Sequence, residues 1–191
     1  MTAKILAFAG SARRNSFNKK LLAIAVRGAR SAGAEVTAID LADYPMPLYD
    51  GDVEAGDGVP ENARKLRDMM QAHNAFLIAA PEYNSGITPL LKNVIDWTSR
   101  PDGDVAQLAA YGGKVAALVA ASPGALGGLR GLFHVRYVLS NIRVTVLPDQ
   151  VAVPQAGGAF DDAGELTDEA RRGQVEAVGA ALARAAAKLN A

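Results

Sequence analysis

The sequence predicts an α/β protein, a doubly wound three-layer α/β/α sandwich with a five-stranded parallel sheet between two layers of helices. Three observations lead to this prediction. Short apolar runs alternate with longer segments of helical spacing, most of those runs lack polar alternation, and the chain is 191 residues long. Parallel strands covered on both faces are apolar throughout, and a closed parallel barrel needs about 250 residues. We therefore expect residues 1–191 to form a single domain with an open sheet.

The strands are expected at the short apolar runs, several of them rich in β-branched residues, because runs of this length are too short for typical helices. They cover residues 5–9, 36–39, 75–80, 115–121 and 144–147. The segments between them have apolar residues at helical spacing. These expected helices cover about 18–32, 61–71, 89–99, 126–141 and 168–189. The resulting order of elements is βαβαβαβαβα.

The first expected helix carries one apolar stripe, which should pack on the sheet. The stripe consists of Leu21, Leu22, Ala25, Val26 and Ala29. Gly33 follows it at the place where a left-handed residue commonly ends a helix. Short alternating units and right-handed crossovers then predict the strand order 2-1-3-4-5. In such a sheet ligands bind beyond the carboxyl ends of the strands, so the loops after strands one, three and four should converge.

Composition excludes several classes of function. Twenty basic residues balance twenty acidic ones, so no bulk positive field would attract nucleic acid or an anionic membrane. Cysteine is absent, and His73 and His134 lie far apart in the sequence. Disulfides, thiolate chemistry and a metal site are therefore not expected. The apolar run in the N-terminal stretch MTAKILAFAG is too short for a membrane span, and no cleavage-type sequence follows it. We expect a soluble, cytoplasmic protein with no membrane partner.

Two connections are unusually rich in glycine and acidic residues. Segment 49–62, YDGDVEAGDGVPEN, is expected to be an exposed, mobile loop, with a lid or a subunit contact near the site as the alternative. Segment 154–169, PQAGGAFDDAGELTDE, either closes over a neighbour or simply connects, and Thr167 is expected to cap the last helix.

The loop after the first strand, GSARRNSFNKKL, combines hydroxyls, an amide and arginines at the start of a helix. Ser11, Arg13, Ser16 and Asn18 surround that start, where free backbone N–H groups and the helix dipole favour an anion such as a phosphate. The alternative is that Ser16 merely caps the helix beside two surface arginines, Arg13 and Arg14. Neither GxGxxG nor GxxxxGK[ST] occurs here, so the phosphate of a mononucleotide is favoured over a triphosphate or a dinucleotide.

The loops after the third and fourth strands are also polar or glycine-rich. In APEYNSG, Pro81 and Gly86 shape the backbone, Tyr83 offers an apolar wall and Asn84 can donate and accept hydrogen bonds. In ASPGALGGLRG, the glycines permit a close approach of backbone to a ligand. The alternative for each loop is an ordinary turn before a helix. Leu90, Leu91, Val94, Ile95 and Trp97, in the helix after APEYNSG, are assigned to the core or to a subunit interface, and Trp97 to packing.

Three stretches together resemble one family. GSARRNSFNKKL, PEYNSGITPLLKNVIDW and SPGALGGLRG are similar in motif and spacing to the NAD(P)H-dependent FMN reductase family, which includes chromate and quinone reductases, and the resemblance extends through Leu147. It implies a flavodoxin-like fold that binds FMN noncovalently. One departure is His73-Asn74, where the family usually has an acidic residue; His73 is expected to end a helix, and His134, beside Phe133 and Tyr137, to serve packing or an interface.

The resemblance also implies the residues of the cofactor site. Phosphate and ribityl would be held by Ser11, Arg13, Ser16, Phe17 and Asn18. The isoalloxazine ring would be lined by Pro81, Glu82, Tyr83, Asn84, Ser85 and Gly86, and the pocket completed by Ser122 and Gly124. Arg100 is a weaker candidate, as a neighbour of the open face of the ring.

The activity implied is that of an FMN-dependent oxidoreductase passing hydride from NADPH or NADH through flavin N5 to a small-molecule oxidant, such as a quinone, free flavin or chromate. We expect a ping-pong cycle in which no residue acts as a nucleophile, because the flavin carries the chemistry. A flavodoxin-like electron carrier without nicotinamide activity and an inactive redox sensor or scaffold remain alternatives, whereas the absence of GxSxG and of Ser–His–Asp spacing disfavours a hydrolase. A homodimer or homotetramer is expected, with Trp97, Phe133 and Tyr137 as contact candidates.

Overall fold

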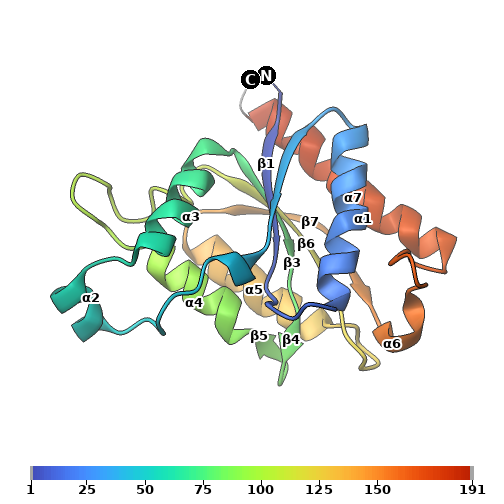
Figure 1. Ribbon diagram of the computed structural model, residues 1–191. Helices are drawn as coiled ribbons and strands as arrows, with labels where there is room; N and C mark the ends of the chain where they lie inside the picture. The colour runs from blue at the N-terminus through green and yellow to red at the C-terminus, as the bar shows by residue number, and fades with distance from the viewer. Residues whose placement is uncertain (1, 190–191) are drawn as a thin grey trace.

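The computed structural model describes residues 2–189 and contains a five-stranded parallel sheet with the order β2-β1-β3-β6-β7 (Figure 1). The strands are β1 (Lys4–Ala9), β2 (Glu35–Ile39), β3 (Ala75–Ala79), β6 (Val115–Ala121) and β7 (Thr145–Val153). Counted along the chain, this is the order 2-1-3-4-5, so the predicted topology is confirmed. A separate two-stranded hairpin consists of β4 (Glu82–Tyr83) and β5 (Gly86–Ile87).

Helices cover both faces of the sheet. One layer is formed by α1 (Phe17–Ser31) and α7 (Glu169–Leu189), and the other by α3 (Glu61–Ala72), α4 (Pro89–Thr98) and α5 (Leu129–Asn141) (Figure 1). Shorter helical pieces are η1 (Leu41–Asp43), α2 (Gly51–Asp57) and α6 (Ala156–Ala159). Within residues 2–189, none of the helices has the length and apolarity needed to span a bilayer.

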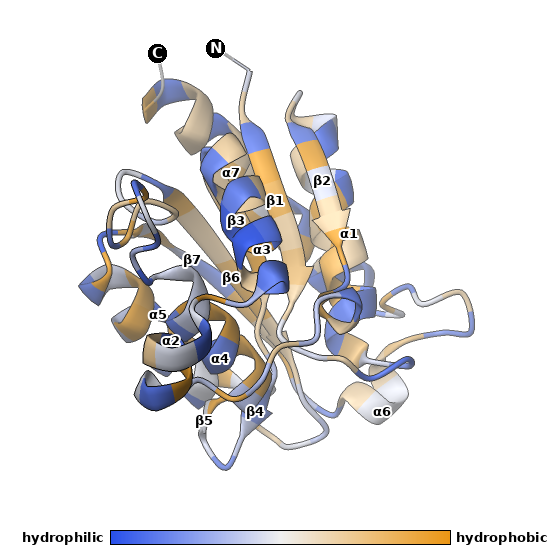
Figure 2. Ribbon diagram, turned by 60° about the vertical axis from the view of Figure 1, so that its left-hand side comes forward, coloured by the Kyte–Doolittle hydropathy of each residue, from blue (hydrophilic) through white to orange (hydrophobic). Residues whose placement is uncertain are grey.

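The sheet separates two hydrophobic cores. Ile5 and Ala7 of β1 join the core under α1 and α7, whereas Leu6 and Phe8 join the core under the opposite helices, because successive side chains of a strand point to opposite faces. Every residue of β3 and β6 is buried. Both faces of these strands are therefore covered, which explains why the sequence showed apolar runs rather than alternation. The hydropathy colouring shows the sheet mostly in orange and tan between the helices (Figure 2).

Two element boundaries differ from the prediction for local reasons. β7 continues beyond 147 to Val153 across Pro148, which is tolerated because β7 is an edge strand. α5 begins at Leu129 rather than at 126, because Gly127 (φ 63°) and Gly128 (φ 93°) lie in the left-handed region, where a right-handed helix cannot run.

The acidic segment 49–62, which the sequence predicted to be an exposed, mobile loop, contains the short helix α2 and is bonded to α4, because the N–H of Tyr49 donates to Asn93 Oδ1 at 2.7 Å. The Nε–H of Arg100 donates to Glu54 at 2.8 Å, and the hydroxyl of Tyr49 donates to the same carboxylate at 2.9 Å. The bond from Arg100 outweighs burial and holds the pKa of Glu54 below its ordinary value. Trp97 is fully buried and donates its indole N–H to Pro47 O at 2.8 Å, which confirms its packing role.

The cap of the last helix is Asp168, so the assignment of Thr167 as the cap is wrong. The N–H of Arg171 donates to Asp168 Oδ1 at 3.0 Å, whereas the N–H of Thr167 donates to Ala159 O at 3.1 Å. Thr167 and Asp168 are adjacent, and both residue types commonly cap helices. Because Thr167 is bonded to α6, Asp168 takes the capping position. Segment 154–169 thus packs on its own chain.

The two helices of the first layer touch at backbone distance. A Cβ atom added at Gly28 would lie 1.9 Å from Glu176 O, and one added at Gly179 would lie 1.9 Å from Ala25 O. No real atom pair can occupy such a distance, so both positions require glycine. This contact holds α7 against α1, the helix whose first turn borders the site described below.

We expect Gly179→Ala to lower the free energy of unfolding by at least about 2 kcal/mol, because the new methyl group forces α1 and α7 apart. Gly173→Ala in the same helix is the matched control: nothing lies within 4 Å of its added Cβ, and alanine favours helix by about 1 kcal/mol. Urea unfolding of both variants without added ligand provides the measurement. Equal midpoints for the two variants would contradict the proposed contact.

Candidate functional site

The loops after β1, β3 and β6 meet at the carboxyl edge of the sheet, where they enclose a cavity of about 70 Å³. This is the convergence that the strand order predicted. Its lining comprises Ser11, Arg13, Ser16, Phe17, Asn18, Pro81, Glu82, Tyr83, Ala121, Ser122 and Pro123. Four residues of the expected site, Asn84, Ser85, Gly86 and Gly124, do not line this cavity. Asn84 and Ser85 form the hairpin turn, Gly86 begins β5, and Gly124 lies in the loop after β6.

The first turn of α1 presents unused hydrogen-bond donors to the cavity. Ser16 stands at the N-cap position and is buried, yet its hydroxyl makes no capping hydrogen bond. Within residues 2–189, the N–H groups of Phe17 and Asn18 find no acceptor, and the guanidinium groups of Arg13 and Arg14 find no carboxylate. A helix start with free N–H groups beside arginine can bind an anion. These observations disfavour the alternative in which Ser16 only caps the helix.

Asn18 lines the cavity, but both ends of its carboxamide are engaged by the protein. Its Nδ2 donates to Ala121 O at 2.8 Å, and its Oδ1 accepts from Ala121 N at 3.0 Å. The side chain is buried. Asn18 therefore ties the start of α1 to the end of β6. This contact fixes the loop after β1 relative to the loop after β6.

The PEYN stretch forms the β4–β5 hairpin, which the sequence reasoning read as a loop. Glu82 pairs with Ile87 and Tyr83 with Gly86. The two turn residues between them are non-glycine residues with positive φ, Asn84 at 49° and Ser85 at 68°, as a type I′ turn requires. Asn-Ser is a weaker signal for such a turn than Asn-Gly, which is why the hairpin was missed.

Glu82 was expected to line the ring, but its carboxylate points to α5. Its Oε2 accepts from the N–H of Gly131 at 2.7 Å, and its Oε1 accepts from Arg130 Nη2 at 3.2 Å. Its neighbour Tyr83 is largely open to solvent, with 51% of its surface exposed.

Two residues that the sequence reasoning missed complete the frame of the site. Thr88 caps α4 and donates its hydroxyl to Gly10 O at 2.8 Å, which joins the hairpin end to the first loop. Threonine directly before proline at a helix start was a usable signal for this cap. Phe160 stacks on Phe17 with ring centroids 5.9 Å apart. No sequence signal connected residues so far apart.

The glycines after β6 serve the fold rather than the approach of a ligand. A Cβ at Gly127 would lie 2.6 Å from Pro154 N, and one at Gly128 would lie 2.9 Å from Ala120 Cβ. At Gly127 and Gly128 the backbone packs closely against the chain itself, so the prediction that they let a ligand approach is wrong for these two residues. Gly124 is exposed, and its N–H donates to Ser122 Oγ at 3.3 Å, which orients a hydroxyl of the cavity wall.

The remaining candidates lie elsewhere. Arg100 is bound to Glu54 and does not line the cavity. Trp97 is fully buried, so it cannot offer the subunit contact that was expected of it. His73 follows α3 as its C-cap residue, as expected, and His134 is exposed on α5.

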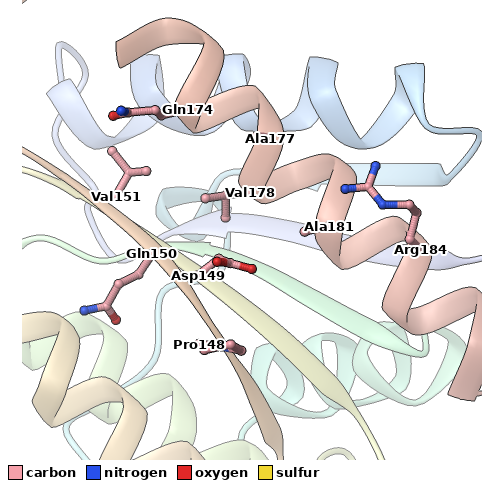
Figure 3. A pocket seen from close by; sticks show the side chains of 9 residues that line it. All are labelled: Pro148, Asp149, Gln150, Val151, Gln174, Ala177, Val178, Ala181 and Arg184. Carbon is pink, nitrogen blue, oxygen red and sulfur yellow. The ribbon is translucent and has the colours of Figure 1, made fainter. Parts of the chain in front are cut away.

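A larger hollow of about 630 Å³ lies between β7 and α7 (Figure 3). Its charged residues, Asp149 and Arg184, come from the middle of the edge strand and from the last helix. None of the three converging loops contributes to it. The hollow has the greater volume, but the free hydrogen-bond donors lie at the smaller cavity, which is therefore the candidate site.

Comparison with known proteins gives consistent results. The profile of the family described as NADPH-dependent FMN reductase matches residues 3–158. An NAD(P)H-dependent FMN reductase of Pseudomonas aeruginosa is 36% identical over 170 residues, which are 88% of this chain and 87% of that protein. An NAD(P)H:quinone oxidoreductase of Solanum tuberosum is 34% identical over 192 residues, covering 98% of this chain and 94% of that protein.

A solved structure extends the likeness to three dimensions. The flavoenzyme FerB, an NAD(P)H:(acceptor) oxidoreductase from Paracoccus denitrificans, superimposes with a TM-score of 0.80 at 26% identity. The match covers 97% of this chain and 98% of that chain. The expected flavodoxin-like sandwich is thus the fold of a known flavoenzyme.

We expect Asn18→Ala to lower the free energy of unfolding by about 2 kcal/mol, because it leaves the buried N–H and C=O of Ala121 without partners. Ser16→Ala is the matched control, since its hydroxyl makes no capping bond; its effect should stay within about 0.5 kcal/mol. Both values come from urea unfolding of ligand-free protein. A larger loss for Ser16→Ala than for Asn18→Ala would overturn this division of roles.

Proposed function

The chain belongs to the NADPH-dependent FMN reductase family, and from that membership we propose that it is an FMN-dependent oxidoreductase, which couples the oxidation of NADPH or NADH to the reduction of quinones. One structural observation carries the proposal: a helix terminus with free hydrogen-bond donors and a hairpin stand on the same sheet edge with a cavity between them. FMN has a phosphate at one end and a planar ring at the other, and this edge offers a place for each.

The cavity matches the phosphate end of FMN. A volume of about 70 Å³ holds a group of a few heavy atoms but not a three-ring system. Ser16, Arg13 and the first N–H groups of α1 supply donors that the protein itself does not use. We propose that Ser11, Arg13, Ser16, Phe17 and Asn18 surround the phosphate and ribityl.

The ring would then lie outside the cavity, along the hairpin. Its proposed neighbours are Pro81, Glu82, Tyr83, Asn84, Ser85 and Gly86, with Ser122 and Gly124 at the far side. The hairpin offers main-chain N–H and C=O groups, and the half-exposed Tyr83 leaves this edge open to solvent. An open edge can admit a flat donor or acceptor from outside.

When bound, FMN supplies a ring nitrogen, N5, that accepts hydride from the nicotinamide and passes two electrons to the acceptor. The role proposed for the chain is to position the cofactor. Arg13 and the terminus of α1 hold the charged end of the cofactor, and the hairpin limits where the ring lies. No side chain is assigned as a nucleophile, and donor and acceptor share one open side, which predicts ping-pong kinetics.

Acceptor choice follows from the openness of the site. Quinones are the acceptor named for a relative from Solanum tuberosum, and free flavin and chromate are proposed as further acceptors. The net charge of zero disfavours the alternative of an electron carrier, because carriers of this fold dock partners through an acidic surface.

We further propose that residues 1–191 act as one cytoplasmic FMN-binding domain that assembles into a homodimer or homotetramer. NADPH and NADH are available in that compartment. The exposed side chains of Phe133 (55%) and Tyr137 (76%) on α5 offer the apolar contact surface.

We expect Arg13→Ala and Ser16→Ala to weaken FMN binding by about tenfold or more while leaving turnover at saturating FMN nearly unchanged, because both residues contact the phosphate end and not the ring. Equilibrium dialysis gives the affinity and steady-state assays give the turnover. Arg143→Ala, whose side chain is exposed on the loop between α5 and β7, is the control. Slower turnover with unchanged FMN affinity would contradict the assignment.

The purified protein reconstituted with FMN is expected to oxidise NADPH or NADH continuously when a benzoquinone is present, because donor and acceptor can visit the same side in turn. Loss of absorbance at 340 nm measures the rate, and double-reciprocal plots at several quinone concentrations should be parallel. FMN binding without turnover from either donor would establish the carrier alternative instead.

A further inference from the structure

We propose that Glu82 is a positioning residue, whose carboxylate locks the β4–β5 hairpin onto the start of α5 and so fixes the backbone that faces the flavin ring. This inference rests on the proposed function and adds a residue role to it.

The carboxylate of Glu82 acts as the cap that α5 lacks. The N-cap position is Gly128, which has no side chain and therefore no capping hydrogen bond. Glu82 Oε2 accepts from the N–H of Gly131, the third residue of the helix, at 2.7 Å, and Arg130 holds Oε1 at 3.2 Å. A negative charge at a helix start also interacts favourably with the helix dipole. Only 9% of the Glu82 side chain is exposed, against 58% for that of Arg130.

Two glycines shape a notch for this residue. A Cβ at Gly131 would lie 3.0 Å from Glu82 Cβ and 3.2 Å from its Cγ, and a Cβ at Gly128 would lie 3.7 Å from the same Glu82 Cβ. Both added Cβ atoms would meet the same Cβ of Glu82, so the N-cap residue Gly128 and the helical residue Gly131 border one notch. The glycines of GGLRG thus leave room for Cβ and Cγ of Glu82, so that its carboxylate reaches the start of α5.

The hairpin needs this anchor because its own structure is minimal. It has two paired positions, and two-stranded hairpins of this size are marginal in isolation. Asn84 and Ser85 both have positive φ, a conformation that costs a non-glycine residue of order 1 kcal/mol. A docked carboxylate at the first residue of β4 offsets this cost. The shape of the turn depends on Glu82.

The test compares Glu82→Ala with Glu82→Gln, using Gly173→Ala as the control. Amide hydrogen exchange of residues 82–87 is measured first, without FMN. We expect Glu82→Ala to speed this exchange about fivefold to tenfold, a factor that corresponds to the loss of one cap. Glu82→Gln should restore most of the protection, because its amide oxygen can still accept from Gly131.

The same variants are then saturated with FMN. Glu82→Ala should change the visible circular dichroism of bound FMN and lower kcat/KM for NADPH between about 10-fold and 100-fold, because a misplaced ring loses alignment. Its FMN affinity should fall far less than that of Arg13→Ala. Gly131→Ala should reproduce both effects from the helix side, since its methyl group displaces Glu82.

The outcomes separate this inference from the proposed function. Unchanged exchange of residues 82–87 in Glu82→Ala, or failure of Glu82→Gln to rescue it, overturns the inference even if the wild-type protein turns over NADPH. Faster exchange restored by glutamine supports it even if the wild-type protein proves inactive with both nicotinamides. In that case the proposed function fails and the anchoring role of Glu82 stands.

Discussion

The candidate site depends on the parallel register of β1, β3 and β6. Ala9 pairs with Ala79, and Ala79 pairs with Val119, so the three strands end at nearly the same height. Backbone bonds continue the ladder past the strands, from Gly10 N to Ala79 O at 2.9 Å and from Ala80 N to Val119 O at 2.8 Å. Three loops therefore start from fixed points a strand spacing apart, about 5 Å. Without that register, residues more than 100 positions apart in the chain could not line one small cavity.

A local anion site is compatible with a chain of zero net charge because the donors are concentrated by geometry. The positive end of α1, the free N–H groups of its first turn and Arg13 act over a few ångströms, whereas the balancing carboxylates are committed elsewhere. Asp40 is paired with Lys19, and Glu165 with Arg27. The hydrogen bonds from Lys19 and from Ala42 N outweigh partial burial and keep the pKa of Asp40 below its ordinary value. Asp40 and Glu165 are thus paired with cations outside the cavity.

The sequence predicted the parts of this protein that depend on local pattern. The five strands, their order and the five main helices follow from apolar runs and helical spacing, and the free helix start at Ser16 follows from residue types at a strand end. What it could not predict depends on partners distant in the chain. Segment 49–62 is held because Tyr49 packs on Trp97 and Glu54 pairs with Arg100. Asn18 is engaged because Ala121 lies opposite, and Gly127 is required by Pro154. A residue type shows what a side chain can do, but only the fold shows which of its groups remain free.

Asn18 and Glu82 show how the protein separates anchoring from alignment. The corner at the start of α1, where we propose that phosphate binds, is bordered by buried bonds from Asn18 to Ala121 and from Thr88 to Gly10. Such bonds are stronger in a low-dielectric interior and hard for water to replace. The start of the hairpin is held by one carboxylate at the end of α5, beside an arginine that is more than half exposed. The corner is therefore rigid by construction, whereas the position of the hairpin is set by a contact of modest strength. A cofactor held at its charged end by the rigid part and adjusted at its ring by the weaker part can remain bound while the environment of the ring changes.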